Sequence, residues 1–180
     1  FFKGSTRYIS PGKAAEICAQ VPAFVATVGL FVNEPLADVN RIIGSLRLGL
    51  VQFHGDETPE YCDSVGHLYM KALRATNRDQ IEVEAQSFQT AQAILVDTAT
   101  DGQFGGTGKT FDWRMLPDLA KPVVLAGGLD ATNVGAAIAA THPYAVDVSG
   151  GVERSRGVKD VAKMKKFVEA VQSADRSNNE

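Results

Sequence analysis

Six short apolar runs, separated by amphipathic stretches, constrain what this chain can fold into. Their first residues follow one another at intervals of 19 to 29 positions, and the runs are Val25–Val32, Leu50–Phe53, Tyr69–Ala75, Ala93–Val96, Pro122–Ala126 and Tyr144–Val148. Consecutive apolar residues indicate strands that are buried on both faces, as in parallel sheets. Parallel strands need long crossovers, which helices usually provide. The pattern therefore predicts an α/β fold built of strand–helix units.

The segments between the runs carry helix-start signals. Ser10-Pro11 and Thr58-Pro59 each place a capping hydroxyl before a proline at the first helical position. Asn33-Glu34-Pro35 precedes an apolar helical face that extends to Leu46, and Arg78–Phe88 is a weaker helix prediction.

Two aspartates are expected to cap the later helices. Asp130 is predicted to cap a helix over Ala131–Ala140, and Asp160 is predicted to cap the last helix. The expected inward face of this last helix consists of Val161, Met164, Phe167, Val168 and Val171.

The residues that follow the strands favour a closed barrel over an open, doubly wound sheet. Nearly every run ends in a polar or glycine-rich loop, as in His54–Glu57, Asp97-Thr98, Gly127-Gly128 and Asp147–Gly151. A barrel gathers all such loops on one face, whereas an open sheet concentrates them at a switch point.

The predicted (β/α)8 TIM barrel is incomplete. It needs eight strands, and six strand–helix units are recognisable. Phe1–Ser5 is typical of the end of a strand and its loop, because Arg7–Pro11 already leads into a helix. We therefore expect residues 1–180 to form a single, partial barrel domain that lacks the first βα unit and most of strand 2.

Composition and charge exclude several classes of partner. The net charge is −3 and no basic run occurs, so neither nucleic acid nor a membrane is an expected partner. No apolar stretch reaches the roughly 20 residues that span a bilayer. Cys18 and Cys62 lack metal-site spacing and are expected to be reduced thiols of a cytoplasmic protein, with Cys18 buried.

Glycine-rich turns after the last two strands predict a phosphate site. Gly127 and Gly128 end one strand, and Ser149 and Gly150 end the next. Glycines allow backbone N–H groups to approach an anion closely, and a phosphate site at this place recurs in barrels. The alternative is that these glycines only make tight turns.

Four side chains are candidates for catalysis or substrate binding. Asp97 and Asp147 each emerge at the end of an apolar strand, where a carboxylate can act in acid–base chemistry or merely cap a loop. His54 is expected either to bind substrate or to cap a turn. Arg7 can pair with a substrate carboxylate through its planar fork, or be an ordinary surface arginine.

The segment Asp101–Thr110 imitates a nucleotide-binding P-loop without matching its spacing. Gly108 follows Gly102 by six positions, whereas the pattern requires five. We interpret the segment as a glycine-rich loop beside Asp97 that closes over a ligand.

Seven segments, taken together and in order, resemble phosphoribosylanthranilate isomerase, the barrel enzyme of tryptophan biosynthesis. They are Gly4–Ser10, Val28–Asn33, Val51–Glu57, Leu95–Thr98, Gly105–Trp113, Leu125–Leu129 and Val146–Glu153. The resemblance implies an Amadori rearrangement of N-(5-phosphoribosyl)anthranilate to 1-(2-carboxyphenylamino)-1-deoxyribulose 5-phosphate, without metal or cofactor. It also implies a monomer or a homodimer whose partner is a small phosphorylated substrate.

The resemblance also implies residue roles. Asp97 corresponds to the general acid and Arg7 to the residue that pairs with the anthranilate carboxylate. His54 and Asp147 correspond to residues that line the substrate site. The phosphate loops correspond to Gly127, Gly128, Ser149 and Gly150.

The sequence departs from the family at the general base. In the family this base is a cysteine in a Lys-Ile-Cys-Gly segment on the first strand, and the 180 residues contain no such segment. Cys18 and Cys62 are both predicted in helices and are not expected to replace it. The segment as it stands is therefore expected to lack the base-catalysed step. Thr6 and Gly150 also replace a usual proline and a usual serine.

Two other functions remain open on the sequence alone. One is another phosphate-sugar barrel enzyme: an indole-glycerol-phosphate synthase, for which Lys71 would be the strand lysine, or a ribulose-phosphate epimerase, which needs metal-binding histidines. The other is a non-catalytic fragment or a protein that only binds a phosphorylated ligand.

Overall fold

A computed structural model of the chain describes residues 1–98 and 112–177. The chain divides into two compact units, each described by itself. The first compact unit comprises Phe1–Ala72 and Ser87–Ala93, and the second comprises Leu73–Gln86 and Ile94–Glu180.

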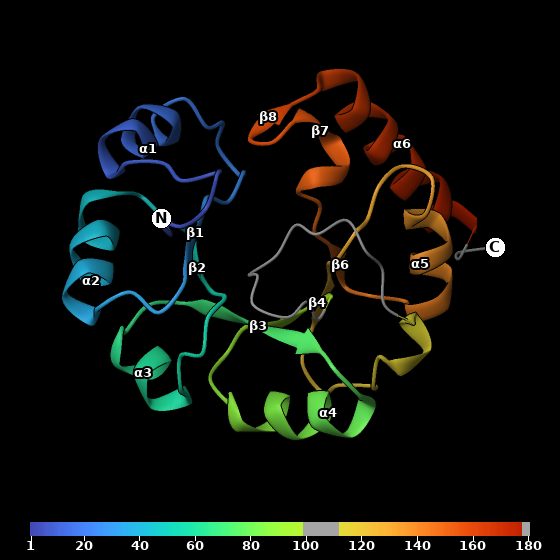
Figure 1. The fold of residues 1–180 in the computed structure, drawn as a ribbon, viewed down its shortest axis with the longest axis horizontal. Coiled ribbons are helices and arrows are strands. Elements are labelled where there is room, and N and C mark those ends of the chain that lie inside the picture. Colours follow the sequence, from blue (N-terminus) through green and yellow to red (C-terminus); the bar gives the residue numbers. More distant parts are fainter. Residues whose placement is uncertain (99–111, 178–180) are drawn as a thin grey trace. The chain divides into compact units, whose positions relative to one another are not determined.

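The first compact unit alternates helices with parallel strands. Its elements are α1 (Pro11–Cys18), β1 (Val28–Phe31), α2 (Leu36–Ser45), β2 (Leu50–Phe53), α3 (Pro59–Ser64) and the first residues of β3 (Tyr69–Ala75), shown in blue to green in Figure 1. In the register, Val28 of β1 is opposite Leu50 of β2, and Val51 of β2 is opposite Tyr69 of β3. The parallel strand–helix units predicted for this part are confirmed.

Local capping explains two of these helices. The Ser10 hydroxyl accepts from the Lys13 backbone N–H at 3.4 Å, and the Thr58 hydroxyl accepts from the Tyr61 N–H at 3.3 Å. A proline begins each of these helices, as predicted. The expectation that Cys18 is buried is wrong: it is half-buried, because α1 buries only Ala14.

The second compact unit contains further parallel strands and helices, together with a short strand pair before the last helix. Its elements after β3 are α4 (Arg78–Ser87), β4 (Ala93–Thr98), η1 (Trp113–Met115), β5 (Val123–Leu125), α5 (Val134–Thr141), β6 (Ala145–Val146), η2 (Gly150–Val152), β7 (Glu153–Ser155), β8 (Val158–Lys159) and α6 (Val161–Ser177). β5 pairs in parallel with both β4 and β6, while β7 and β8 form a short antiparallel pair. Each of the six predicted runs therefore contains a strand.

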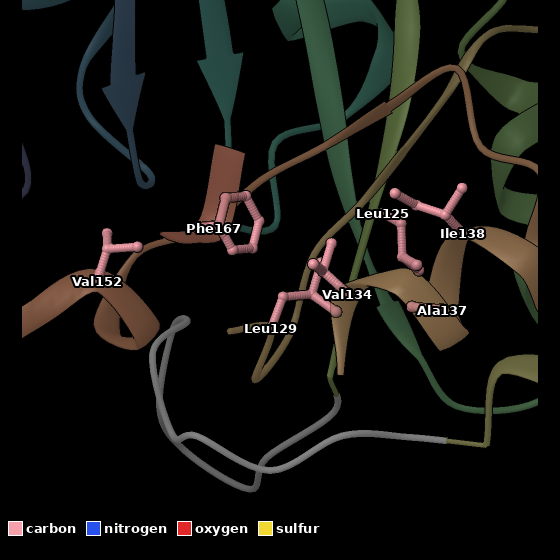
Figure 2. Close-up of a cluster of buried hydrophobic side chains, with 7 residues drawn as sticks. All are labelled: Leu125, Leu129, Val134, Ala137, Ile138, Val152 and Phe167. Atoms are coloured by element: carbon pink, nitrogen blue, oxygen red, sulfur yellow. The ribbon is translucent and has the colours of Figure 1, made fainter. Parts of the chain in front are cut away.

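One cluster of buried side chains holds the second compact unit together (Figure 2). It joins β5, α5, η2 and α6 through Leu125, Leu129, Val134, Ala137, Ile138, Val152 and Phe167. Because Leu129 and Val152 flank the two glycine turns, the cluster also fixes the backbone on which those turns are built.

Two predictions about the later helices are wrong in detail. α5 begins at Val134 rather than at Ala131, and the Asp130 carboxylate instead accepts from the N–H and hydroxyl of Thr132. These hydrogen bonds, chiefly the one from the hydroxyl, lower the pKa of Asp130. Asp160 does cap α6, accepting from the N–H groups of Ala162 and Lys163.

The predicted inward face of α6 is wrong at most positions. Phe167 is buried and Val171 is partly buried, but Val161, Met164 and Val168 are exposed. The face that packs on the core continues instead through Ala170 and Ala174. No helix among residues 1–98 and 112–177 is long and apolar enough to cross a membrane.

Candidate functional site

His54 directly follows β2 in the first compact unit. Its backbone N–H donates to the Phe31 carbonyl of β1 at 2.9 Å, and its ring Nδ1 lies 2.8 Å from the Gln52 side-chain nitrogen. The half-buried His54 ring is therefore held in place by the Gln52 side chain.

Arg7 lies in a tight turn before α1. The Arg7 N–H donates to the Ser5 hydroxyl at 3.0 Å, and the Tyr8 N–H donates to the Ser5 carbonyl at 3.1 Å. The Ser5 N–H in turn donates to the Phe2 carbonyl at 3.0 Å. These bonds fix the backbone from which the half-buried Arg7 side chain extends.

A buried ion pair supports the loop that carries His54. Lys71 Nζ lies 3.0 Å from Glu57 Oε2 and donates to the Gly55 carbonyl at 2.6 Å. The two carboxylate oxygens of Glu57 also accept from the N–H groups of Asn33 (2.7 Å) and Gly55 (2.9 Å). The Lys71 and Glu57 side chains are 4% and 2% exposed, so the pair is shielded from water. Through its hydrogen bonds, this buried pair links the loop after β1 to the loop after β2.

Asp97 and Asp147 occupy equivalent places on two strands of the second compact unit. The Ala126 N–H donates to the Val96 carbonyl at 2.9 Å, and the Asp147 N–H donates to the Leu125 carbonyl at 2.8 Å. The register thus places both aspartates at the carboxyl edge of the sheet, on either side of Ala126. Asp97 is buried (8% exposed), whereas Asp147 is exposed.

The turn after β5 requires glycine. Gly127 and Gly128 have φ angles of 89° and 64°, which residues with a side chain rarely adopt. The Asn133 side chain closes this turn, since Nδ2 donates to the Gly128 carbonyl at 3.0 Å and Oδ1 accepts from the Asp130 N–H at 2.9 Å.

The turn after β6 lies against the first turn. A Cβ placed on Gly151 would lie 2.0 Å from the Leu129 carbonyl oxygen, so only glycine fits there. Lys159 Nζ donates to the Ser149 carbonyl at 2.8 Å and lies 3.1 Å from Glu153 Oε1. The turn after β6 is therefore packed against the Leu129 carbonyl at Gly151 and hydrogen-bonded by Lys159 at Ser149.

The structure brings most of the predicted site residues to one edge. In the second compact unit, the carboxyl ends of β4, β5 and β6 carry Asp97, Gly127, Gly128, Asp147, Ser149 and Gly150. Arg7 and His54 belong to the first compact unit. The segment Asp101–Thr110, predicted to close over a ligand, lies outside the described residues.

Some residues around these turns were missed by the sequence analysis. Asn133 and Lys159 contact the glycine turns, and Lys71 with Glu57 supports the loop of His54. A lysine inside an apolar strand was a usable signal for a buried ion pair, because a buried charge needs a partner. Nothing in the local sequence of Asn133 or Lys159 marks a contact with a carbonyl.

A metal ion needs a cluster of ligating side chains. Within the described ranges, 1–98 and 112–177, no group of three His, Cys, Asp or Glu side chains is arranged to hold a metal ion.

Cys62 is expected to be unreactive in the folded protein. It is fully buried in α3, and burial raises the pKa of its thiol from 9.0 to about 12. Because the thiolate is the reactive form, iodoacetamide at about pH 8 should leave Cys62 unmodified in the native state and modify it in urea. Peptide mass spectrometry would check this, and equal labelling rates in the two states would contradict it.

The fold and the edge described above define a class of β/α proteins whose site is built from the loops at the carboxyl ends of parallel strands. The 3-hexulose-6-phosphate synthase of Salmonella typhimurium has this fold. It superposes with a TM-score of 0.67 at 12% identity over 91% of this chain and 81% of that one, a likeness of fold alone.

Sequence comparison gives the family. The model for N-(5'-phosphoribosyl)anthranilate (PRA) isomerase matches residues 1–170. The isomerase of Pseudomonas putida (strain F1) is 49% identical over 97% of this chain and 85% of its own length. That of Pseudomonas fluorescens (strain SBW25) is 47% identical over 97% of this chain and 83% of its own length. The chain belongs to the phosphoribosylanthranilate isomerase family.

Solved structures agree with this assignment. The phosphoribosylanthranilate isomerase of Thermotoga maritima superposes with a TM-score of 0.84 at 37% identity, over 94% of this chain and 83% of that one. Another phosphoribosylanthranilate isomerase, solved with reduced 1-(o-carboxyphenylamino)-1-deoxyribulose 5-phosphate, superposes with a TM-score of 0.79 at 34% identity, over 94% and 82% of the two chains.

Proposed function

We propose that this protein converts N-(5-phosphoribosyl)anthranilate to 1-(2-carboxyphenylamino)-1-deoxyribulose 5-phosphate. The observation that carries the proposal is the carboxyl edge of the sheet in the second compact unit, where buried Asp97 and the two glycine turns all lie. A family member in complex with the reduced product supports the same substrate class.

Asp97 is the general acid in this proposal. The reaction needs a proton on the furanose ring oxygen, so that the C1–O bond breaks while the anilino nitrogen forms a C=N bond. A base then removes the proton from C2 of the sugar, and the resulting enolamine becomes the ketone as a proton is added at C1 and the C2 hydroxyl loses its proton. The rearrangement is therefore a series of proton transfers, and a carboxyl group at the end of an apolar strand is suited to make the first of them.

Arg7, His54 and Asp147 bind the substrate in this proposal. Arg7 pairs with the anthranilate carboxylate, since a guanidinium matches a carboxylate through two parallel hydrogen bonds. His54 lines the site and hydrogen-bonds the substrate through its ring. Asp147 contacts the sugar hydroxyls, because an ionised carboxylate accepts hydrogen bonds from them.

The two glycine turns bind the phosphate in this proposal. Backbone N–H groups of Gly127, Gly128, Ser149 and Gly150 are the donors. The left-handed backbone of Gly127 and Gly128 supports this role, because consecutive N–H groups in such turns form a concave site for an anion.

Neither cysteine is the general base in this proposal. Cys62 is fully buried with a raised thiol pKa, and Cys18 lies at the end of α1. We place the base in a part of the family's barrel that these 180 residues do not match, together with the first βα unit and most of strand 2. We also propose that residues 1–180 belong to a single barrel domain, that the protein works in the cytoplasm, and that it is a monomer or homodimer.

The proposed substrate can be tested by isothermal titration calorimetry with reduced 1-(o-carboxyphenylamino)-1-deoxyribulose 5-phosphate. We expect a Kd of about 1 μM or lower, which corresponds to at least about 8 kcal/mol of binding free energy. The same compound without its phosphate is the control and should bind much more weakly. Equal affinity for both compounds would contradict the proposed phosphate site.

Replacing Arg7 is expected to raise KM more than it lowers kcat. Arg7→Met removes a bidentate partner of the carboxylate, a loss of about 2–3 kcal/mol or roughly 30- to 150-fold in affinity. Arg7→Lys keeps the charge without the fork and should fall between Met and wild type. Steady-state kinetics would check this, and an unchanged KM in both variants would remove Arg7 from the site.

An indole-glycerol-phosphate synthase activity is disfavoured by one observation. Its strand lysine would have to be Lys71, but Lys71 Nζ is buried between Glu57 and the Gly55 carbonyl. A metal-dependent epimerase would lose its activity with a chelator, and a protein that only binds would bind the reduced product analogue without turnover.

A further inference from the structure

The two glycine turns share a structural feature that their phosphate-binding role does not require. In each turn, one peptide carbonyl accepts a hydrogen bond from a side chain that lies later in the sequence. Asn133 Nδ2 donates to the Gly128 carbonyl at 3.0 Å, and Lys159 Nζ donates to the Ser149 carbonyl at 2.8 Å.

A held carbonyl also fixes a donor. In a planar trans peptide, the C=O of one residue and the N–H of the next point in opposite directions. The bond from Asn133 therefore turns the Leu129 N–H away from the Asn133 side chain. The bond from Lys159 does the same for the Gly150 N–H.

Both anchoring side chains are themselves oriented by a second bond. Asn133 Oδ1 accepts from the Asp130 N–H at 2.9 Å, so both ends of its amide are used. Lys159 Nζ lies 3.1 Å from Glu153 Oε1, and the Glu153 side chain is only 5% exposed. An anchor that is fixed in this way can hold a peptide plane, whereas a freely rotating surface side chain cannot.

The two turns are also in direct contact. Gly151 packs so closely against the Leu129 carbonyl that no side chain would fit between them. A rotation of the peptide in one turn therefore displaces the backbone of the other. The orientation of each peptide therefore matters to the whole pair of turns.

We infer that Asn133 and Lys159 are positioning residues of the phosphate site, each holding one peptide so that the N–H of Leu129 or Gly150 points at the anion. This inference rests on the proposed function for the location of the phosphate. It adds the Leu129 N–H to the proposed donors, and it explains how the direction of this N–H and of the Gly150 N–H is set by side chains that do not themselves bind the phosphate.

The test uses matched variants of the whole protein and inorganic phosphate as the probe. Lys159→Met removes the anchor, and Lys159→Arg restores a donor of the same charge. Lys163→Met is the control, because it also removes a lysine charge, but Lys163 Nζ donates to the Glu153 carbonyl at 2.7 Å rather than to the Gly128 or Ser149 carbonyl. Asn133→Ala removes the other anchor, and Asn133→Asp keeps the acceptor for Asp130 if the alanine variant does not fold.

Calorimetry is expected to show about tenfold weaker phosphate binding in Lys159→Met and in the Asn133 variant, the loss of one well-directed hydrogen bond. Lys159→Arg and Lys163→Met should remain within about threefold of wild type, a difference below 1 kcal/mol. In kinetics, KM for phosphoribosylanthranilate should rise in parallel while kcat stays within about threefold.

Three results would overturn the inference. They are unchanged phosphate binding in Lys159→Met and the Asn133 variant, an equal loss in Lys163→Met, and no phosphate binding by wild type. An equal loss in the control would mean that only net charge matters. Phosphate binding with the expected variant pattern but no turnover would support the inference and contradict the proposed function.

Discussion

Replacing Asp97 with asparagine is expected to lower kcat by about 10³-fold, within the range that general acid catalysis contributes. Asparagine has nearly the same shape, so the fold and the binding of the reduced product analogue should be retained. The loss is expected in kcat because the proton on the ring oxygen is needed only as the C1–O bond breaks. Steady-state kinetics together with calorimetry would separate the two effects.

Asp118→Asn is the matched control for this prediction. Asp118 is an exposed aspartate of the same compact unit, and the same chemical change there should leave kcat unaltered. A value of kcat for Asp97→Asn within a few-fold of wild type would remove Asp97 from the role of general acid.

Removing the cation of the buried ion pair is expected to have the largest effect on stability. Lys71→Met leaves the Glu57 carboxylate buried without its counter-ion, which typically costs about 3–5 kcal/mol. Urea denaturation at neutral pH would measure the change in the free energy of unfolding. The double variant Lys71→Met/Glu57→Gln should recover at least about half of the loss, because no uncompensated charge remains buried.

An exposed ion pair provides the control. Lys13 and Glu16 lie 2.5 Å apart with side chains 64% and 62% exposed, so water already solvates both charges. Lys13→Met should change the free energy of unfolding by less than about 1 kcal/mol. A loss in Lys71→Met no larger than in Lys13→Met would show that the buried pair does not stabilise the loops after β1 and β2.

The sequence predicted those parts of the fold that depend on local chemistry. The strands coincide with the apolar runs because burial on both faces demands apolar side chains at successive positions. The helix starts at Pro11 and Pro59 follow from a hydroxyl and a proline that act within one turn. Asp97 and Asp147 were located for the same reason, since the end of an apolar strand fixes the edge at which they lie.

The sequence did not predict features that depend on what packs against a segment. The periodicity of α6 gives an apolar stripe, but only the partners of α6 decide that Phe167 is covered and Val161 is not. Asp130 was expected to cap a helix, yet Thr132 supplies nearer donors and the helix begins at Val134. Such outcomes depend on which of several neighbouring groups makes the better contact. A pattern of residue types does not show which one this is.

The contacts of Lys159 and Asn133 with backbone carbonyls were also invisible in the sequence. Lys159 lies ten positions after Ser149, and its side chain reaches back through the pairing of β7 with β8. Asn133 directly precedes α5, and its side chain reaches back five positions to the Gly128 carbonyl. Lysine and asparagine are common on protein surfaces, so their contact with a carbonyl cannot be predicted before the conformation of the turn is known.

The most direct test of the proposed function is the conversion of N-(5-phosphoribosyl)anthranilate by the full-length protein, produced from its own reading frame. Chromatography would follow the appearance of the ketose product with and without a chelator. We predict a kcat/KM of at least about 10⁴ M⁻¹s⁻¹, unaffected by the chelator, and about 10³-fold lower in Asp97→Asn. Background turnover by a folded protein that still binds the reduced product analogue would contradict the account and indicate a protein that only binds.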